Sequence, residues 1–213
     1  MASLINMQGS KNRDKKLIRA VNSFLKQTHE DKELIIVSDG CDITNRIYDE
    51  NWKTNPIIKL FPSPKQVMYS GGIRNIGCKM ATGDIITYLD NDDVLGKNHL
   101  SEILNKFDTD KYGWVYYDDL MVLPETKFTK FQKRMVEPRF GSIGTSSISH
   151  VNFYTNPKYK GTVIPEWNNL NGYGHDFLYV LKLASFGGPF MKLKDMAEVN
   201  SAYIVCHYFN CDE

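Results

Sequence analysis

The 213-residue sequence predicts an α/β fold in which helices flank a mainly parallel central sheet. Strand-like and helix-like segments alternate through the first half of the chain. Two of the strand-like segments, residues 34–37 and 85–89, are continuous apolar runs, as expected of strands that are covered on both faces. The first helix-like segment carries its apolar side chains on one stripe, which is typical of a helix that packs on a sheet.

The elements of the first half follow one another in a regular order. The stripe on the first helix consists of Leu17, Ile18, Val21, Phe24 and Leu25. Crossovers between parallel strands are expected to be right-handed. The strands are predicted at residues 3–7, 33–38, 57–60 and 85–89, and the helices at residues 14–27, 45–52, 72–81 and, after the fourth strand, near 97–107.

The second half has a weaker pattern. Strands are predicted at residues 114–117 and 203–205, with a polar segment at 125–139 and a loop of small residues at 141–147. A helix is predicted at residues 175–186, and its apolar face is expected to consist of Phe177, Leu178, Leu181 and Ala184.

Composition excludes several classes of protein. The chain has 26 Lys and Arg against 25 Asp and Glu, a net charge of +1 that argues against a nucleic-acid partner. The four cysteines show neither metal-site spacing nor a dense disulfide framework, which favours a reducing compartment. No apolar run approaches the roughly 18–20 residues of a membrane helix. We therefore expect one soluble cytoplasmic domain over residues 1–213, without a transmembrane segment.

Acidic side chains follow two of the predicted strands. Asp39 ends the second strand, and Asp90, Asp92 and Asp93 follow the fourth. Ligands of open α/β sheets bind beyond the carboxyl ends of the strands, so these carboxylates are expected at one edge. A divalent cation such as Mn²⁺ or Mg²⁺ would offset their mutual repulsion. The alternative is that the acidic cluster caps the helix near residues 97–107.

Four segments carry a family resemblance in their order and spacing. They read FLKQT at residues 24–28, ELIIVSDG at 33–40, RNIGCKMATGDII at 74–86 and YLDNDD at 88–93. The chain resembles nucleotide-sugar glycosyltransferases of the Rossmann-like GT-A fold, particularly those of family two. The resemblance covers residues 1–107 well and is fainter beyond.

The resemblance implies a division of labour along the chain. Residues 1–107 would bind the nucleotide sugar and the metal, and residues 108–213 would bind the acceptor. The length and start of the chain are also similar to an N-terminal glycosyltransferase domain of larger algal-virus proteins. That similarity implies further domains and a location in the host cytoplasm.

The resemblance also implies roles for residues near the donor. Asp39 would accept a hydrogen bond from the uracil ring of a UDP-sugar, with an Asx turn as the alternative. Arg74 would face the nucleotide, with an exposed helical arginine as the alternative. The base pocket would be lined by Met7 and Gln8. Asn91, which lies between Asp90 and Asp92, would also bind the nucleotide-sugar donor.

The metal would be held by the Asp90, Asn91, Asp92 motif together with a late histidine. Asp90 would face the ribose and the metal, and Asp92 would bind the metal that bridges the diphosphate. His207 stands where the family places a histidine ligand, with a structural role as the alternative. Asp93 is expected to cap a helix or to support the ligands.

The resemblance places an acidic pair before a late helix, and here that pair reads His175-Asp176. Asp176 would be the base that deprotonates the acceptor hydroxyl in an inverting reaction, with a first-turn helix acid as the alternative. His175 departs from the family pattern, which puts acceptor binding and the stereochemistry in doubt, and it is a candidate catalytic residue beside Asp176. Trp167 and Tyr173 are candidates for stacking on acceptor sugars or for core packing.

Two further motifs have a weaker claim to function. Residues 116–119 place two acids after a strand, and this segment is expected to be a solvated strand end. A zinc site built from Cys206, His207 and Cys211 lacks a fourth partner.

Together these features predict a metal-dependent glycosyltransferase that moves a sugar from a UDP-sugar to a glycan or another hydroxyl acceptor. The alternatives are a sugar-phosphate nucleotidyltransferase, whose Gly-rich, lysine-containing loop is missing, and a non-catalytic module that binds nucleotide sugars.

Overall fold

The computed structural model describes residues 2–3, 12–66, 70–123, 130–167 and 174–206. Strands and helices alternate through the first half, as predicted. The elements there are β1 (Ala2–Ser3), α1 (Arg13–Leu25), β2 (Leu34–Asp39), α2 (Asp42–Asn51), β3 (Ile58–Ser63), α3 (Gly71–Met80) and β4 (Ile85–Thr87).

The second half contains more strands than its pattern predicts. Its elements are β5 (Val94–Leu95), α4 (His99–Lys106), β6 (Trp114–Tyr117), β7 (Asp119–Val122), β8 (Phe131–Arg134), the 3₁₀ turn η1 (Thr145–Ser147), β9 (Ile148–Val151), the 3₁₀ turn η2 (Pro157–Tyr159), α5 (His175–Phe186), β10 (Phe190–Leu193) and β11 (Tyr203–Val205). β8 lies inside the segment that the sequence marks only as polar.

The strands of the described residues form three sheets. β1, β2 and β3 are parallel, in that order. The second sheet has the order β10-β6-β9-β4, and β9 runs antiparallel to both β6 and β4. The third has the order β5-β11-β7-β8. The expectation of a mainly parallel sheet holds for the first half, whereas the second half is mixed because β9 inserts between β4 and β6.

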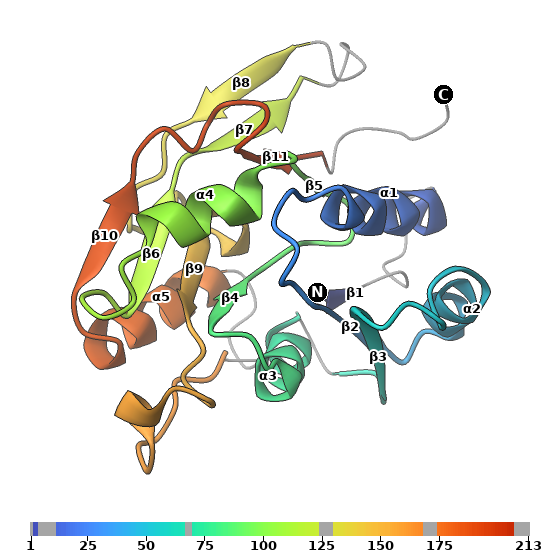
Figure 1. Ribbon diagram of the computed structural model, residues 1–213, viewed down its shortest axis with the longest axis horizontal. Helices are drawn as coiled ribbons and strands as arrows, with labels where there is room; N and C mark the ends of the chain where they lie inside the picture. The colour runs from blue at the N-terminus through green and yellow to red at the C-terminus, as the bar shows by residue number, and fades with distance from the viewer. Residues whose placement is uncertain (1, 4–11, 67–69, 124–129, 168–173, 207–213) are drawn as a thin grey trace.

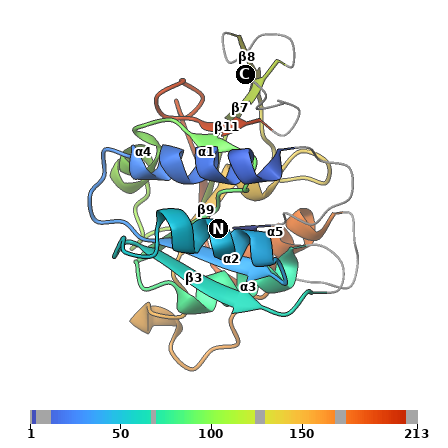
Figure 2. The same cartoon turned by 90° about the vertical axis from the view of Figure 1, so that its right-hand side faces the viewer.

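Helices cover both sides of these strands. In Figure 1, α1 lies above β1, β2 and β3 and α4 crosses the upper part of β6, while α3 and α5 lie lower in the view. Figure 2 shows the same separation from the side. All six residues of β2 are buried, as the apolar run predicts for a strand covered on both faces. On α1, Leu17, Val21 and Phe24 face the core, as predicted from the stripe.

Two expectations for the helices are wrong. On α5 the buried residues are Tyr179, Val180 and Leu183, whereas Leu181 is exposed. The helix packs through its aromatic residue Tyr179, which the aliphatic pattern did not include. The acidic cluster does not cap α4 either, because that helix begins at His99, several residues beyond the cluster.

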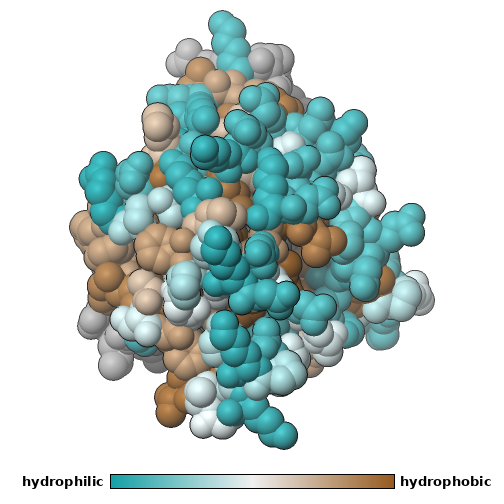
Figure 3. All heavy atoms as spheres, turned by 60° about the vertical axis from the view of Figure 1, so that its left-hand side comes forward, coloured by the Kyte–Doolittle hydropathy of each residue, from teal (hydrophilic) through white to brown (hydrophobic). Residues whose placement is uncertain are grey.

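The surface mixes polar and apolar side chains. On the face drawn in Figure 3, hydrophilic side chains cover the centre and hydrophobic ones gather toward the left edge. Scattered exposed apolar residues are normal for folded proteins. Among the described residues, no helix has both the length and the apolar character needed to span a bilayer.

Candidate functional site

Residues from both halves of the chain meet beyond the ends of β2 and β4. Asp39 is the last residue of β2, and Asp90 follows β4. Arg74 lies on α3, and His175 and Asp176 form the first turn of α5. Arg74 brings the acidic motif after β4 next to the first turn of α5, whereas among the described residues the partners of the Asp39 carboxylate are Lys65 and Gln66.

Arg74 joins these motifs. One guanidinium nitrogen, Nη2, lies 3.0 Å from Asp90 Oδ1, and the other, Nη1, lies 2.9 Å from His175 Nε2. Nη1 also forms an ion pair with Asp176 Oδ1 at 3.6 Å. Burial opposes the charge of the guanidinium, but Asp90 and Asp176 outweigh it and raise the pKa of Arg74. The alternative of an exposed helical arginine is wrong, because Arg74 is buried.

The Trp167 ring packs against the guanidinium of Arg74. The Arg74 guanidinium lies 4.8 Å from the centre of the indole ring, a cation–π contact. On the other side, Trp167 stacks on Tyr179 with ring centroids 4.0 Å apart. The Asn75 side chain bonds both the backbone N–H and the carbonyl of Trp167. Trp167 is therefore a core residue, and the stacking role on an acceptor sugar is wrong for it.

The acidic motif after β4 is held by Tyr203 of β11 and by Cys206, which directly follows that strand. The Asp90 backbone N–H donates to the Tyr203 hydroxyl, which donates to Asp93 Oδ2. The Cys206 N–H donates to Asp93 Oδ1 at 2.6 Å. Burial raises the pKa of Asp93 well above its usual range, and the charges of Asp92 and Asp90 add to this shift. Asp93 therefore supports the motif, and β11 of the second half helps to hold a motif of the first.

Asp90 and Asp92 can contribute carboxylates to a cation. Burial raises the pKa of Asp90; Arg74 opposes this shift, and the charges of Asp92 and Asp176 add to it. Within the described ranges, the Asp92 carboxylate has no hydrogen-bond partner, and Asn91 Nδ2 is a buried donor without one. Mg²⁺-type ions are commonly held by one or two carboxylates plus phosphate oxygens. This donor set fits such an ion, although in the part of the chain that is described no three acidic, His or Cys side chains are placed so that together they could hold a metal ion.

Asp39 is held by the loop after β3. Its Oδ1 accepts a hydrogen bond from the Gln66 N–H at 2.6 Å, and its Oδ2 pairs with Lys65. Gly40 adopts a φ of 62°, which allows the chain to turn directly after the strand. The partners of Asp39 come from another loop, so the local Asx turn is not what fixes this carboxylate.

Asp176 lies in the first turn of α5, so the first-turn alternative describes its position correctly. Its Oδ1 accepts a hydrogen bond from the Thr145 hydroxyl at 2.8 Å. Arg74 approaches the same oxygen. Gly174, with a φ of 94°, begins the helix. These contacts leave Asp176 Oδ2 without a donor among the described residues.

The expectation of a solvated strand end at residues 116–119 is wrong. Asp119 is fully buried and accepts hydrogen bonds from Arg134, Ser146 and Ser147. The antiparallel pairing of β7 with β8 sets Asp119 directly opposite Arg134. This cluster holds η1, the turn that also carries the hydroxyl donor to Asp176. The hydrogen-bond cluster around Asp119 can be identified only from the pairing of β7 with β8, because the sequence of β8 shows no strand pattern of its own.

Cys211 of the candidate zinc site and four other predicted residues lie outside the described residues. These four are Met7, Gln8, Tyr173 and His207.

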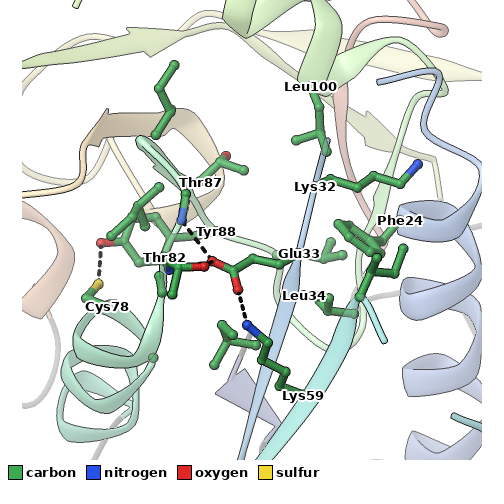
Figure 4. A pocket seen from close by; sticks show the side chains of 18 of the residues that line it. Phe24, Lys32, Glu33, Leu34, Lys59, Cys78, Thr82, Thr87, Tyr88 and Leu100 are labelled. Carbon is green, nitrogen blue, oxygen red and sulfur yellow. Dashed lines mark hydrogen bonds and ion pairs between the residues drawn. The ribbon is translucent and has the colours of Figure 1, made fainter. Parts of the chain in front are cut away.

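A cavity of about 580 Å³ lies beside the site, between β2, α3 and β4 (Figure 4). Arg74 and Asp90 are among the residues that line it, whereas Asp39, Asp92 and Asp176 are not. Figure 4 shows the Glu33 carboxylate reaching across to Thr82 and Lys59. Of the candidate site residues that the structure describes, Arg74 and Asp90 alone line the cavity.

Comparisons with known proteins identify the relatives of this arrangement. A family model described as glycosyl transferase family 2 matches residues 10–184. An uncharacterized glycosyltransferase of Nostoc sp. is 35% identical over 106 residues, which make up 49% of this chain and 33% of that protein. The match therefore spans about a third of the relative's own length.

Solved structures share the fold. Staphylococcus aureus TarS 1-349 in complex with UDP-GlcNAc has a TM-score of 0.68 and 16% identity, covering 96% of this chain and 57% of that chain. The mannosyltransferase PcManGT from Pyrobaculum calidifontis, in complex with GDP-Man and Mn²⁺, has a TM-score of 0.59 and 14% identity, covering 92% of this chain and 54% of that one. The GT-A fold expected from the sequence is confirmed.

Proposed function

Because the chain belongs to glycosyl transferase family 2, we propose that it transfers a sugar from a UDP-sugar to a hydroxyl group of a glycan or another acceptor. The observation that carries the proposal is the position of Arg74, which contacts both the acidic motif after β4 and the first turn of α5. A donor site and an acceptor base must be adjacent for a direct transfer.

The donor would lie along the carboxyl ends of β2 and β4. Asp39 would bind the uracil ring, with Met7 and Gln8 lining the base pocket, and Asn91 would offer its unpartnered Nδ2 to the donor. Asp90 and Asp92 would hold Mn²⁺ or Mg²⁺, joined by His207. When bound, such an ion neutralises negative charge on the leaving diphosphate. Binding of UDP-GlcNAc by TarS and of GDP-Man and Mn²⁺ by PcManGT supports this assignment by analogy.

The acceptor would be bound by residues of the second half. Thr145 and Arg74 both approach Oδ1 of Asp176, which leaves Oδ2 to accept the proton of the acceptor hydroxyl. His175 contacts Arg74 and Asp176, so its role would be to hold both side chains. In an inverting reaction Asp176 would act as the general base.

The first test is the thermal unfolding midpoint with UDP, Mn²⁺, both or neither. A ligand at 100 times its Kd stabilises a protein by ~2.7 kcal/mol, which is several degrees at this size. We expect a shift that requires UDP and Mn²⁺ together, and a much smaller one in Asp92→Asn. GDP in place of UDP is the matched control for the base.

Turnover is the second test. We expect release of UDP from UDP-sugars in the presence of hydroxyl acceptors, and its loss in Asp176→Asn with the Kd for UDP nearly unchanged. A larger shift with GDP than with UDP would contradict the uracil assignment. Undiminished transfer by Asp176→Asn would contradict the base assignment.

A further inference from the structure

The side chains of Arg19, Ser23 and Gln27 lie four residues apart along α1 and its C-terminal end, on one face. We propose that these three residues, called here the α1 stripe, position the metal-binding motif. The inference rests on the proposed function, and it assigns a positioning role to residues that the proposed donor and acceptor sites do not include.

Each member of the stripe bonds the backbone of the segment that follows Asp90. Arg19 Nη2 donates to the Asp92 carbonyl at 2.6 Å. The Ser23 hydroxyl accepts from the Leu95 N–H at 3.0 Å. Gln27 Nε2 donates to the Gly96 carbonyl at 2.8 Å, and its Oε1 accepts from the Leu100 N–H at 3.1 Å. The stripe therefore pairs with backbone groups from the acidic motif to the start of α4.

The opposite side of this segment is held by the chain before β11. The Gly96 N–H donates to the Ala202 carbonyl at 2.8 Å. A Cβ at position 96 would lie 2.3 Å from the Val199 carbonyl oxygen, so only glycine fits there. The segment between Asp90 and α4 is therefore held on one side by α1 and on the other by residues 199–202.

The position of Asp92 depends on these backbone hydrogen bonds more than the positions of its neighbours Asp90 and Asp93 do. Asp90 is held by Arg74, and Asp93 by Tyr203 and Cys206. No contact to the Asp92 carboxylate occurs among the described residues, so its direction is set by its backbone. The Asp92 carbonyl is fixed by the Arg19 guanidinium, a charge-assisted hydrogen bond. The stripe would therefore set where Asp92 presents its oxygens to a cation.

The test separates metal-dependent from metal-independent binding. The Kd for UDP is measured by calorimetry with and without Mn²⁺, and the ratio of the two values is the metal-dependent gain. Loss of an outer partner of a metal ligand typically weakens metal affinity by about 10- to 100-fold. We expect Arg19→Ala to reduce the gain by about tenfold. UDP binding without metal is expected to stay at the wild-type value, which general loosening of the fold would not allow.

Four variants complete the test. Arg19→Lys, which keeps a charged donor, is expected to restore most of the gain. Ser23→Ala is neutral and is expected to reduce the gain by a smaller factor. Lys26→Ala removes an exposed cation directly after the last residue of α1 and serves as the charge-matched control, with the wild-type gain expected. Asn22→Ala is the neutral control, because Asn22 is an exposed polar residue adjacent to the stripe.

The outcomes are distinguishable. A folded Arg19→Ala protein with the wild-type gain overturns the proposed positioning role of the stripe and leaves the proposed function intact. An equal loss in Lys26→Ala overturns it as well, because charge alone would explain the effect. A wild-type protein without any gain overturns the proposed metal instead. If Arg19→Ala does not fold, Ser23→Ala decides the question, and a wild-type gain in that variant counts against the stripe.

Discussion

Arg74 is a buried cation between two carboxylates, and its contacts link the two motifs of the proposed site. Its side chain is 7% exposed, whereas those of Asp90 and Asp176 are 36% and 28% exposed. A buried charge without its partner is destabilising, so these groups depend on one another. The partial exposure of the carboxylates moderates that dependence.

Arg74→Met is expected to lower the free energy of unfolding, because Asp90 and Asp176 lose their partner. Breaking a buried pair typically costs about 3–5 kcal/mol, and we expect the lower end, since water reaches both carboxylates. Urea denaturation at pH 7 measures the loss. Lys79→Ala on the same helix is the control: Lys79 pairs with Glu166 at the surface, which predicts a change of about 0–1 kcal/mol. Equal losses would argue against a special role for Arg74.

Thr145 orients the proposed base. Thr145→Val keeps the shape of the side chain and removes the hydroxyl that donates to Asp176 Oδ1. A small misplacement of a reacting group can slow a reaction by about 100-fold, so we expect kcat for transfer to fall between about 10- and 100-fold. The Kd for UDP should not change. Thr145→Ser is expected to retain most of kcat, and an unimpaired Thr145→Val would exclude this role.

At the scale of elements, Glu33 ties three strands together. Its carboxylate, at the start of β2, accepts hydrogen bonds from Lys59 on β3 and from Thr82 and Gly83 before β4. Burial disfavours the charged carboxylate, but these donors outweigh burial and lower the pKa of Glu33 to about 2. The parallel sheet and β4 are therefore linked by one ionised side chain.

The lowered pKa of Glu33 predicts a pH-dependent contribution to stability. The unfolded chain binds this proton near pH 4.5 and the folded chain near pH 2, so the contribution is complete above pH 4.5 and is lost as the pH falls toward 2. Its size is on the order of 2–3 kcal/mol. Unfolding of Glu33→Gln should be less steeply pH-dependent in this window. Glu50→Gln, at an exposed ion pair with Arg46, should follow the wild-type curve.

At the same scale, the antiparallel pairing of β7 with β8 has a direct consequence for the site. Asp119 faces Arg134 across the two strands, and Asp119 also holds Ser146 and Ser147 of η1. The position of Thr145 thus depends on a strand pair outside the parallel sheet.

At the scale of the whole molecule, two buried histidines contribute to how the fold responds to acid. The His99 Nδ1–H donates to the Ser201 carbonyl, and His150 lies among Tyr88, Tyr179 and Phe153. Burial lowers the pKa of each histidine to about 4, so both are neutral in the folded protein at pH 7.

These histidines predict a loss of stability at mildly acidic pH. Between pH 6.5 and 4 the unfolded chain takes up protons at both positions while the folded chain does not, so the free energy of unfolding falls. Each histidine contributes on the order of 3 kcal/mol at the bottom of this window. Urea denaturation from pH 7.5 to 4 should show a smaller decrease in His99→Gln, while His29→Gln should match the wild type. An unchanged pH dependence in His99→Gln would contradict the buried neutral state.

The sequence by itself determined the alternation of strands and helices in the first half, the buried apolar face of α1 (Leu17, Val21 and Phe24) and the acids at the ends of β2 and β4. These features are local: side-chain periodicity places apolar residues on one face, and a residue after a buried strand reaches the edge of the sheet. The division into a donor half and an acceptor half stays a prediction.

Only the tertiary structure decided which distant residues share the site. Arg74 reaches His175 across 101 positions, and Trp167 is taken into the core because Arg74 and Tyr179 pack on its two faces. Asp119 is buried because strand pairing places Arg134 opposite it. Such contacts follow from packing and strand register, which no local pattern specifies, since a shift of one residue exchanges the two faces of a strand.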